Sequence, residues 1–292
     1  MARRLLGKEV NEGLNARVAA RCAALKEQGV FPTLAILRCG ERPDDLSYER
    51  GACKRAELLG VAVKKIALPA DVTREALLAA VDELNGDDGV HGVLMLRPLP
   101  RHLREWEDEI CNRLDPRKDV DGMTDGSCAG VFAGKALGFA PCTPSACMEI
   151  LDHYGVDCTG KTAVVIGRSL VVGKPAAMML MGRNATVTVC HTRTRDTAAI
   201  AREADILISS AGVLGSLTED FVRPGQVVID VSINWDEEKG AIAGDAVFEQ
   251  VEPIVAAITP VPGGVGAVTT SVLMDHVVQA AQRQMQERQV SR

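Results

Sequence analysis

Residues 160–175 read Gly-Lys-Thr-Ala-Val-Val-Ile-Gly-Arg-Ser-Leu-Val-Val-Gly-Lys-Pro. The apolar run that starts at Ala163 ends at Gly167, and a second glycine, Gly173, precedes a helix-compatible stretch from Pro175. This order predicts a buried strand, a glycine-bounded turn and a helix with proline in its first turn. Such a turn directs backbone N–H groups and the positive end of the helix toward a pyrophosphate.

The glycine spacing differs from the usual Gly-x-Gly-x-x-Gly pattern of dinucleotide sites, so a plain strand–turn–helix joint explains it about as well. The polar pair Arg168-Ser169 stands where small residues normally sit, and it favours the dinucleotide site.

The next predicted strand, 185–189, indicates which dinucleotide would bind. A site that prefers NAD usually has Asp or Glu at the end of this strand, where the carboxylate binds the ribose 2′-OH. Here residues 190–195 read Cys-His-Thr-Arg-Thr-Arg, and the first carboxylate is Asp196. Hydroxyls and arginines suit a 2′-phosphate, so we expect NADP rather than NAD; a solvated polar loop is the alternative reading.

Composition limits the class of protein. The 292 residues predict two domains, and 47% hydrophobic with 25% charged residues is ordinary for a globular enzyme. The net charge of −6 argues against nucleic-acid binding, which depends on neutralising phosphates. No apolar run approaches the roughly 18–20 residues of a membrane span, and the N-terminus lacks the apolar core of a signal peptide.

Nine cysteines are scattered along the chain without a Cys-x-x-Cys pair or a histidine spaced as a zinc partner. This pattern predicts reduced thiols in the cytoplasm and no metal site. Cys190-His191 could be read as a nucleophile pair, but neighbouring residues at a strand end point to opposite faces.

Two series of alternating strands and helices follow from the apolar patterns, which predicts an α/β fold with parallel sheets and right-handed crossovers. The first series has helices at 8–29, 47–59, 73–84 and 101–114 and strands at 33–39, 61–68 and 92–96. Residues 115–142 read as a turn-rich functional loop system. A helix at 144–154 leads to strands at 162–166, 185–189, 205–209 and 226–230, with a possible fifth at 254–258, and an amphipathic helix over 269–288 follows.

Several motifs occur together, in order and at matching spacing, over nearly the whole chain. They are Pro98-Leu99-Pro100, Lys118-Asp119-Val120-Asp121-Gly122, Pro141-Cys142-Thr143-Pro144, Gly167-Arg168-Ser169 with Val172-Gly173, Cys190-His191-Thr192, Pro224-Gly225 before Val228-Ile229-Asp230, and Thr259-Pro260-Val261-Pro262-Gly263-Gly264-Val265-Gly266. Through these residues the chain resembles the methylenetetrahydrofolate dehydrogenase/cyclohydrolase family, the FolD-type bifunctional enzymes.

The resemblance implies two α/β domains flanking a cleft, with the last helix returning to the N-terminal domain. Residues 1–140 plus 269–292 would form the folate-binding catalytic domain, and 141–268 the Rossmann-like NAD(P)-binding domain. A tetrahydrofolate derivative would be the substrate, NADP the cofactor, and a homodimer the assembly.

The family's functional residues fall on particular positions of this chain. Tyr48, Asp119 and Asp121 would be catalytic, and one of the two aspartates would hold the pteridine, since a carboxylate accepts two N–H bonds at once. Turn chemistry is the alternative for the aspartates, and a half-buried helix residue for Tyr48. Substrate contacts would also come from Pro262, Gly263 and Gly264, and cofactor contacts from Gly167, Arg168, Ser169, Gly173, Thr192 and Ile233.

Two positions depart from the family pattern. The lysine expected four residues after the tyrosine is Ala52, and the glutamine expected before Pro-Leu-Pro is Leu96. Lys54 lies about 240° around the helix from Tyr48 at roughly 100° per residue, so it points away. Arg55 returns to the same face about 10 Å further along, and it cannot deprotonate.

Hydride transfer needs mainly alignment of two bound partners, whereas hydrolysis of the methenyl product needs a proton-transfer group of tuned pKa. The sequence therefore predicts an NADP-dependent methylenetetrahydrofolate dehydrogenase with weak or absent cyclohydrolase activity. A fully bifunctional enzyme that uses another group is one alternative. A non-catalytic folate- or nucleotide-binding interaction protein is another.

Overall fold

The structure is a computed structural model that describes residues 2–290. Its contacts divide the chain into two compact units. The first unit comprises Gly13–Cys142 and the chain from Thr270 onward, and the second comprises Thr143–Thr269 with the N-terminal residues up to Glu12. The last helix thus belongs with the N-terminal half of the chain, as predicted.

The first unit is built on a parallel three-stranded sheet of order β3-β2-β4. Its central strand is almost wholly buried, with Leu34 to Leu37 inaccessible to solvent. The strands are β2 (Thr33–Cys39), β3 (Ala62–Leu68) and β4 (Gly92–Met95), and the helices are α1 (Gly7–Glu27), α2 (Pro43–Leu59), α3 (Arg74–Gly86), η1 (Arg101–Trp106), α4 (Glu107–Asn112), α5 (Asp125–Ala133) and α10 (Thr269–Val290).

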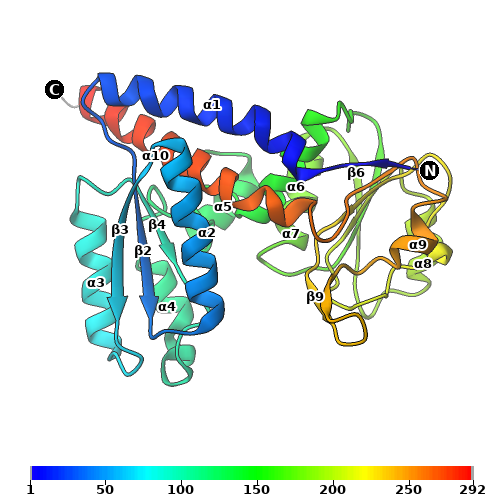
Figure 1. Ribbon diagram of the computed structural model, residues 1–292, viewed down its shortest axis with the longest axis horizontal. Helices are drawn as coiled ribbons and strands as arrows, with labels where there is room; N and C mark the ends of the chain where they lie inside the picture. Colours follow the sequence, from blue (N-terminus) through cyan, green and yellow to red (C-terminus); the bar gives the residue numbers. More distant parts are fainter. Residues whose placement is uncertain (1, 291–292) are drawn as a thin grey trace. The chain divides into compact units, whose positions relative to one another are not determined.

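Helices cover the sheet of the first unit (Figure 1). Apolar side chains of α3, among them Leu77 and Val81, join those of β2, β4 and α4 in one core cluster. Helix α10 lies beside α1, and an ion pair between Arg21 and Asp275 joins them.

The second unit contains a six-stranded parallel sheet of order β1-β11-β8-β7-β5-β6. Its strands are β1 (Arg3–Arg4), β5 (Thr162–Ile166), β6 (Thr186–Cys190), β7 (Ile206–Ser209), β8 (Val227–Asp230) and β11 (Ala257–Ile258), with a separate hairpin of β9 (Asn234–Asp236) and β10 (Ala241–Ala243). The helices are α6 (Cys142–His153), α7 (Gly173–Gly182), α8 (Thr197–Arg202), η2 (Glu219–Phe221), α9 (Phe248–Val251) and η3 (Val265–Ala267).

Local signals located many element ends correctly. The predicted strands at 33–39 and 162–166 match β2 and β5, and Thr73 caps α3 by accepting a hydrogen bond from the Ala76 amide. Helix α2 begins at Pro43, earlier than predicted, because proline suits a first helical turn.

Two expectations are corrected by the structure. Residues 115–142 are not only turns: α5 forms there despite Gly126 and Gly130, capped by the Thr124 side chain and closed by Gly134 in the left-handed conformation. Residues up to Glu12 group with the second unit rather than with the first, because β1 pairs with β11 at the edge of the larger sheet. Within residues 2–290, no helix is long and apolar enough to cross a membrane.

Candidate functional site

The glycine-bounded turn after β5 has the predicted form. Gly167 has φ +119°, and a Cβ atom there would lie 2.5 Å from the Ser210 carbonyl oxygen. At Gly173, the first residue of α7, a Cβ atom would lie 2.2 Å from the carbonyl oxygen of Gly167. Both positions therefore require glycine, so that strand, loop and helix pack tightly together.

The start of α7 differs in detail from the expectation. The helix begins two residues before Pro175, and the Ser169 hydroxyl accepts hydrogen bonds from the amides of Val172 (3.1 Å) and Gly173 (3.4 Å). The Ser169 hydroxyl thus satisfies two amides at this helix end although Val172 is the N-cap residue, and the exposed Arg168 beside it supplies the cationic group.

A cavity of about 410 Å³ opens at the carboxyl ends of β5, β6 and β7. Ligands of open parallel sheets bind at such ends. Its walls include three of the predicted cofactor residues, Gly167, Arg168 and Thr192, together with the loop after β7. Ile233 lines a neighbouring cavity of about 280 Å³ in the same unit, with Pro262, Gly263 and Gly264.

The loop after β6 offers hydroxyls and cations rather than a free carboxylate. His191 Nδ1 accepts a hydrogen bond from the Arg193 amide, and the Thr194 hydroxyl accepts one from the His191 amide, so the loop forms a defined turn. The Asp196 carboxylate accepts from the Ala199 amide as the N-cap of α8. One oxygen of Asp196 is thus used in capping α8, and Arg193 and Arg195 are exposed. This arrangement fits a dinucleotide that carries a 2′-phosphate.

In the first unit, Tyr48 and Asp121 lie close enough for the charge of Asp121 to affect the Tyr48 hydroxyl. Burial raises the pKa of the Tyr48 hydroxyl, and the nearby charge of Asp121 raises it further. Burial also raises the pKa of Asp121 to about 6, and the charge of Asp119 acts in the same direction. The Cys142 thiol has a single proton, which it can donate either to the Val120 carbonyl at 3.4 Å or to the Asp121 carboxylate. A carboxylate of this kind, only partly exposed, can accept N–H donors of a ligand.

The predicted catalytic role of Asp119 is corrected, because the structure gives this residue a structural role. Its side chain is fully buried and accepts hydrogen bonds from the amides of Met123 (3.0 Å) and Thr124 (2.8 Å) and from the Ser127 hydroxyl (2.6 Å). These bonds hold the start of α5, so both oxygens are used within the protein. Of the two aspartates, Asp121 alone remains a candidate for substrate contact.

Ala52 and Leu96 are both buried, and Ala52 is inaccessible to solvent one helical turn after Tyr48. Lys54 is exposed on the other side of α2, as the helical geometry predicts. Arg55 is half-buried, and burial lowers the pKa of its guanidinium. Ala52 therefore places no titratable group at the position where the family pattern has a lysine.

Sequence reasoning missed Cys142 and His276 as neighbours of the candidate site. The His276 Nδ1–H donates to the Val120 carbonyl at 2.8 Å, and the ring packs against Phe139 at 5.0 Å between centroids. Burial lowers the pKa of His276 to about 4, so this donor stays neutral near pH 7. The Pro-Cys-Thr-Pro motif was a signal for Cys142, but nothing local distinguishes His276 within its helix.

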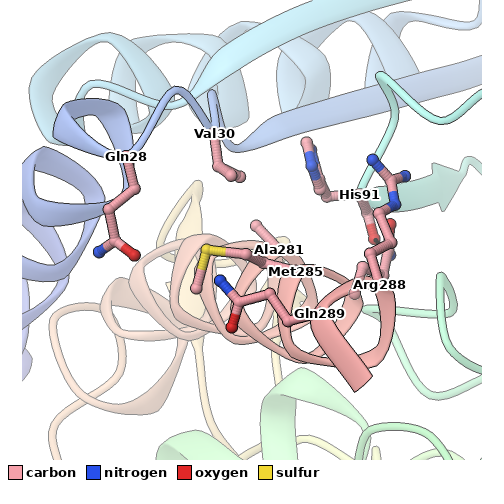
Figure 2. Close-up of a pocket in the computed structure, with 8 residues that line it drawn as sticks. Gln28, Val30, His91, Ala281, Met285, Arg288 and Gln289 are labelled. Carbon is pink, nitrogen blue, oxygen red and sulfur yellow. Dashed lines mark hydrogen bonds between the residues drawn. The ribbon is translucent and has the colours of Figure 1, made fainter. Parts of the chain in front are cut away.

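A groove of about 270 Å³ in the first unit contains none of the predicted site residues. Figure 2 shows it between Ala281, Met285 and Gln289 of α10 and Gln28 and Val30 near the end of α1. His91 on its wall is nearly buried; burial, then the charges of Arg288 and Lys118, lower its pKa to about 4. Its Nδ1 accepts from the Thr33 amide at 3.2 Å, a contact that holds the start of β2. Within residues 2–290, no group of three His, Cys, Asp or Glu side chains could hold a metal ion.

Comparison with known proteins connects these features. A profile described as "Tetrahydrofolate dehydrogenase/cyclohydrolase, catalytic domain" matches residues 5–121, and one described as "Tetrahydrofolate dehydrogenase/cyclohydrolase, NAD(P)-binding domain" matches residues 141–285. This chain belongs to the tetrahydrofolate dehydrogenase/cyclohydrolase family.

Relatives match the chain almost end to end. The bifunctional protein FolD of Carboxydothermus hydrogenoformans is 49% identical over 283 residues, 97% of this chain and 98% of that one. The crystal structure of FolD from Campylobacter jejuni has a TM-score of 0.92 at 37% identity, over 97% of this chain and 99% of that one. The Trypanosoma brucei enzyme, solved with NADP cofactor and an inhibitor, has a TM-score of 0.88 at 34% identity over 97% and 98%.

These matches confirm the predicted family, the two-domain α/β fold and the expectation of an enzyme. An NAD(P)-binding domain is also confirmed, and NADP is the dinucleotide found in a relative of the same fold. As a member of the tetrahydrofolate dehydrogenase/cyclohydrolase family, the chain therefore carries both of its domains, with the alanine and leucine described above in place of the expected lysine and glutamine.

Proposed function

We propose that this protein oxidises 5,10-methylenetetrahydrofolate to 5,10-methenyltetrahydrofolate with NADP, and that its cyclohydrolase activity is weak or absent. The observation that carries the second part is Ala52, fully buried on α2 where a proton-transfer lysine would stand. The cytoplasm is its proposed location, supported by nine cysteines that are all free.

The two units divide the binding of the reactants in this proposal. The predicted folate domain, 1–140 plus 269–292, holds the substrate through Tyr48 and Asp121. The predicted NAD(P) domain, 141–268, provides the cofactor residues Gly167, Arg168, Ser169, Gly173, Thr192 and Ile233 and the substrate-facing loop of Pro262, Gly263 and Gly264.

Each group has a physical task in the reaction. NADP, when bound, supplies the acceptor for a hydride from the methylene bridge. The Asp121 carboxylate accepts N–H bonds of the pteridine and so fixes its orientation. The neutral Tyr48 hydroxyl, kept protonated by its raised pKa, can donate a hydrogen bond in the same site. Because the chain positions both reactants without a titrating lysine at position 52, dehydrogenation is the step that this geometry supports.

Separate measurement of the two activities tests the proposal. The purified protein is mixed with methylenetetrahydrofolate and NADP, and reduced cofactor and methenyl product are followed independently. Reduced NADP with stoichiometric methenyl product supports it. Absence of both, with intact binding of NADP and folate, would favour a non-catalytic binding protein.

Arg168 is expected to select NADP. Replacing Arg168 by Ala should weaken NADP binding by about 1.5–3 kcal/mol, the range for a lost charged hydrogen bond. That corresponds to roughly 10–150-fold in Kd, at 1.4 kcal/mol for each factor of ten. NAD binding should change little, because NAD lacks the 2′-phosphate. Titration calorimetry with both dinucleotides measures this; Arg183→Ala, which breaks a surface ion pair with Asp152, is a matched arginine control. Equal losses for NADP and NAD would remove Arg168 from the 2′-phosphate site.

A homodimer joined through the second unit is also proposed. Strand β6 is last in the sheet order, so among residues 2–290 its outer edge has no strand partner, and Val189 and Met181 are exposed near it. Sedimentation velocity should give twice the 31.1 kDa chain mass. Val189→Lys should shift the protein toward monomer, since a charge would be buried at the joined edges. A wild-type monomer at micromolar concentration would refute the assembly.

A further inference from the structure

Asp245 stands out as a buried carboxylate that the proposed chemistry does not use. Its side chain is inaccessible to solvent and accepts five hydrogen bonds at 2.8–3.3 Å. The donors are the hydroxyls of Ser209 and Ser232, the amides of Ala211 and Val213, and the side-chain amide of Asn234. Burying a carboxylate is costly unless its oxygens accept hydrogen bonds, so this group depends on its five donors being in place.

Three of these donors belong to the end of β7 and the loop that follows it. Ser209, Ala211 and Val213 also line the 410 Å³ cavity beside Gly167 and Arg168. The loop crosses a cavity wall and has no strand pairing of its own, so its N–H groups need another acceptor. Asp245 is that acceptor for Ala211 and Val213, and the Ser232 hydroxyl, itself bound to Asp245, accepts from the Gly212 amide at 3.1 Å.

The other two donors, Ser232 and Asn234, lie on either side of Ile233. The Ile233 side chain is 64% exposed, so packing of its own side chain does little to fix its position. Its neighbours in sequence are both bonded to the one carboxylate, which fixes the backbone between them. Asp245 therefore links Ile233, which is predicted to contact the cofactor, to the loop after β7 through hydrogen bonds.

A second carboxylate holds Asp245 in place. Asp230, at the end of β8, accepts hydrogen bonds from the amides of Asp245 (3.2 Å), Ala246 (2.8 Å) and Ser232 (3.2 Å). A Cβ atom on Gly244 would lie 2.0 Å from an Asp230 oxygen, so glycine is required for this close approach. The Asp245 backbone is thus fixed to the sheet, and its side chain holds both the loop that lines the 410 Å³ cavity and the Ile233 segment that lines the neighbouring 280 Å³ cavity.

We propose that Asp245 is a positioning residue for the dinucleotide, which aligns the loop after β7 and the segment of Ile233 and thereby determines the affinity for NADP. This inference rests on the proposed function, since it deepens the assignment of the same cofactor site. Asp245 itself touches neither reactant; it acts through the backbone and hydroxyl groups that it binds.

The test compares two Asp→Asn variants in one sheet. Asp245→Asn keeps the size of the side chain but replaces one acceptor oxygen by a donor, so the amides of Ala211 and Val213 cannot both be satisfied. Asp205→Asn is the matched control. Asp205 also accepts a backbone amide, from Thr162 at 3.1 Å, and pairs with Arg223, but it lies just before β7, at the opposite end of that strand from Ser209.

For Asp245→Asn we expect the Kd for NADP to rise by about tenfold or more, the size of one lost charged hydrogen bond. The KM for the folate should change less than about twofold on the same arithmetic, where twofold is roughly 0.4 kcal/mol. Asp205→Asn should lower the melting temperature and leave the Kd for NADP unchanged. If both variants lower the melting temperature but leave the Kd for NADP unchanged, Asp245 is only a structural residue and the inference is overturned.

Two further arrangements keep the test decisive. If Asp245→Asn does not fold, Ser232→Ala serves instead. It removes one hydrogen-bond donor to the Asp245 carboxylate and the acceptor of the Gly212 amide, and it should weaken NADP binding severalfold. An unchanged Kd for NADP in this variant overturns the inference. Calorimetric Kd values need no turnover. They test Asp245 even if the wild-type protein proves inactive toward methylenetetrahydrofolate, a result that would refute only the proposed function.

Discussion

Methenyltetrahydrofolate is expected to accumulate while the protein reduces NADP with methylenetetrahydrofolate as substrate. General acid–base groups typically accelerate such a step about 10²–10⁴-fold, so their absence should leave hydrolysis near its buffer-catalysed rate. The physical reason is the fully buried Ala52 one turn after Tyr48, and the buried Leu96 at the expected glutamine position. Absorbance of the methenyl product and of reduced cofactor, recorded together, measures the ratio of the two rates.

Restoring the pair should restore part of the hydrolysis. Ala52→Lys with Leu96→Gln introduces a proton-transfer group together with its hydrogen-bond partner. Ala52→Lys alone should do worse, because a buried ammonium beside Leu96 lacks a partner and is costly. Lys54→Ala is the control on the same helix: its side chain is exposed and should not affect hydrolysis. If the unmodified protein clears the methenyl compound as fast as it forms, the enzyme is bifunctional through another group.

The second large effect is expected at Asp121. Asp121→Ala should raise the folate KM by two orders of magnitude or abolish turnover, since two charge-assisted hydrogen bonds are lost at about 1.5–3 kcal/mol each. NADP binding should stay within twofold of the wild-type value, roughly 0.4 kcal/mol, because the cofactor residues belong to the other unit. Steady-state kinetics measure the folate KM, and calorimetry measures the Kd for NADP.

Neighbouring aspartates supply the controls. Asp125→Ala alters an exposed residue of α5 and should leave folate kinetics unchanged. Asp119→Asn should instead lower the melting temperature, because it breaks the bonds that hold the start of α5. Normal folate kinetics in Asp121→Ala would remove that residue from the site.

The Asp121 carboxyl group also predicts how kcat/KM for the folate depends on pH. Burial, with the charge of Asp119, raises the pKa of Asp121 to about 6. Both oxygens of the carboxyl group can accept N–H bonds only when it is ionised, so kcat/KM for the folate should be full well above pH 6 and fall as the pH drops through about 6. Asp121→Asn should lack this acid limb and keep a low, flat profile. A wild-type profile flat down to pH 5 would contradict the assignment.

Much of the fold followed from local pattern. Apolar runs that end at glycine predicted β2 and β5 residue for residue, because buried parallel strands need continuous apolar side chains and glycines allow the turns beyond them. The absence of a carboxylate directly after β6 and the presence of Arg193 and Arg195 were visible without any coordinates. The departures at Ala52 and Leu96 were also visible in the sequence, but only through its resemblance to the family pattern, which has a lysine and a glutamine at these positions.

The candidate site was predicted less completely. Asp119 and Asp121 occupy equivalent places in one short motif, and only the positions of Thr124 and Ser127 decide that Asp119 is consumed within the protein. Helix α5 contains residues of low helix propensity, so its formation depends on the cap at Thr124 and on the burial of Ser127 and Gly130.

By itself, the sequence predicted the two series of strands and helices and the glycine-bounded turn after β5, because these depend on side-chain type and on spacing within a single element. Its resemblance to the family pointed to Ala52 and Leu96 in place of the lysine and glutamine. Only the tertiary structure decided which carboxylates remain free. Asp119 receives its hydrogen bonds from residues four to eight positions further along the chain, whereas Asp245 gathers donors up to 36 residues away in sequence. A buried carboxylate needs every one of its donors in place, and no local pattern specifies which distant amides the fold will bring to it.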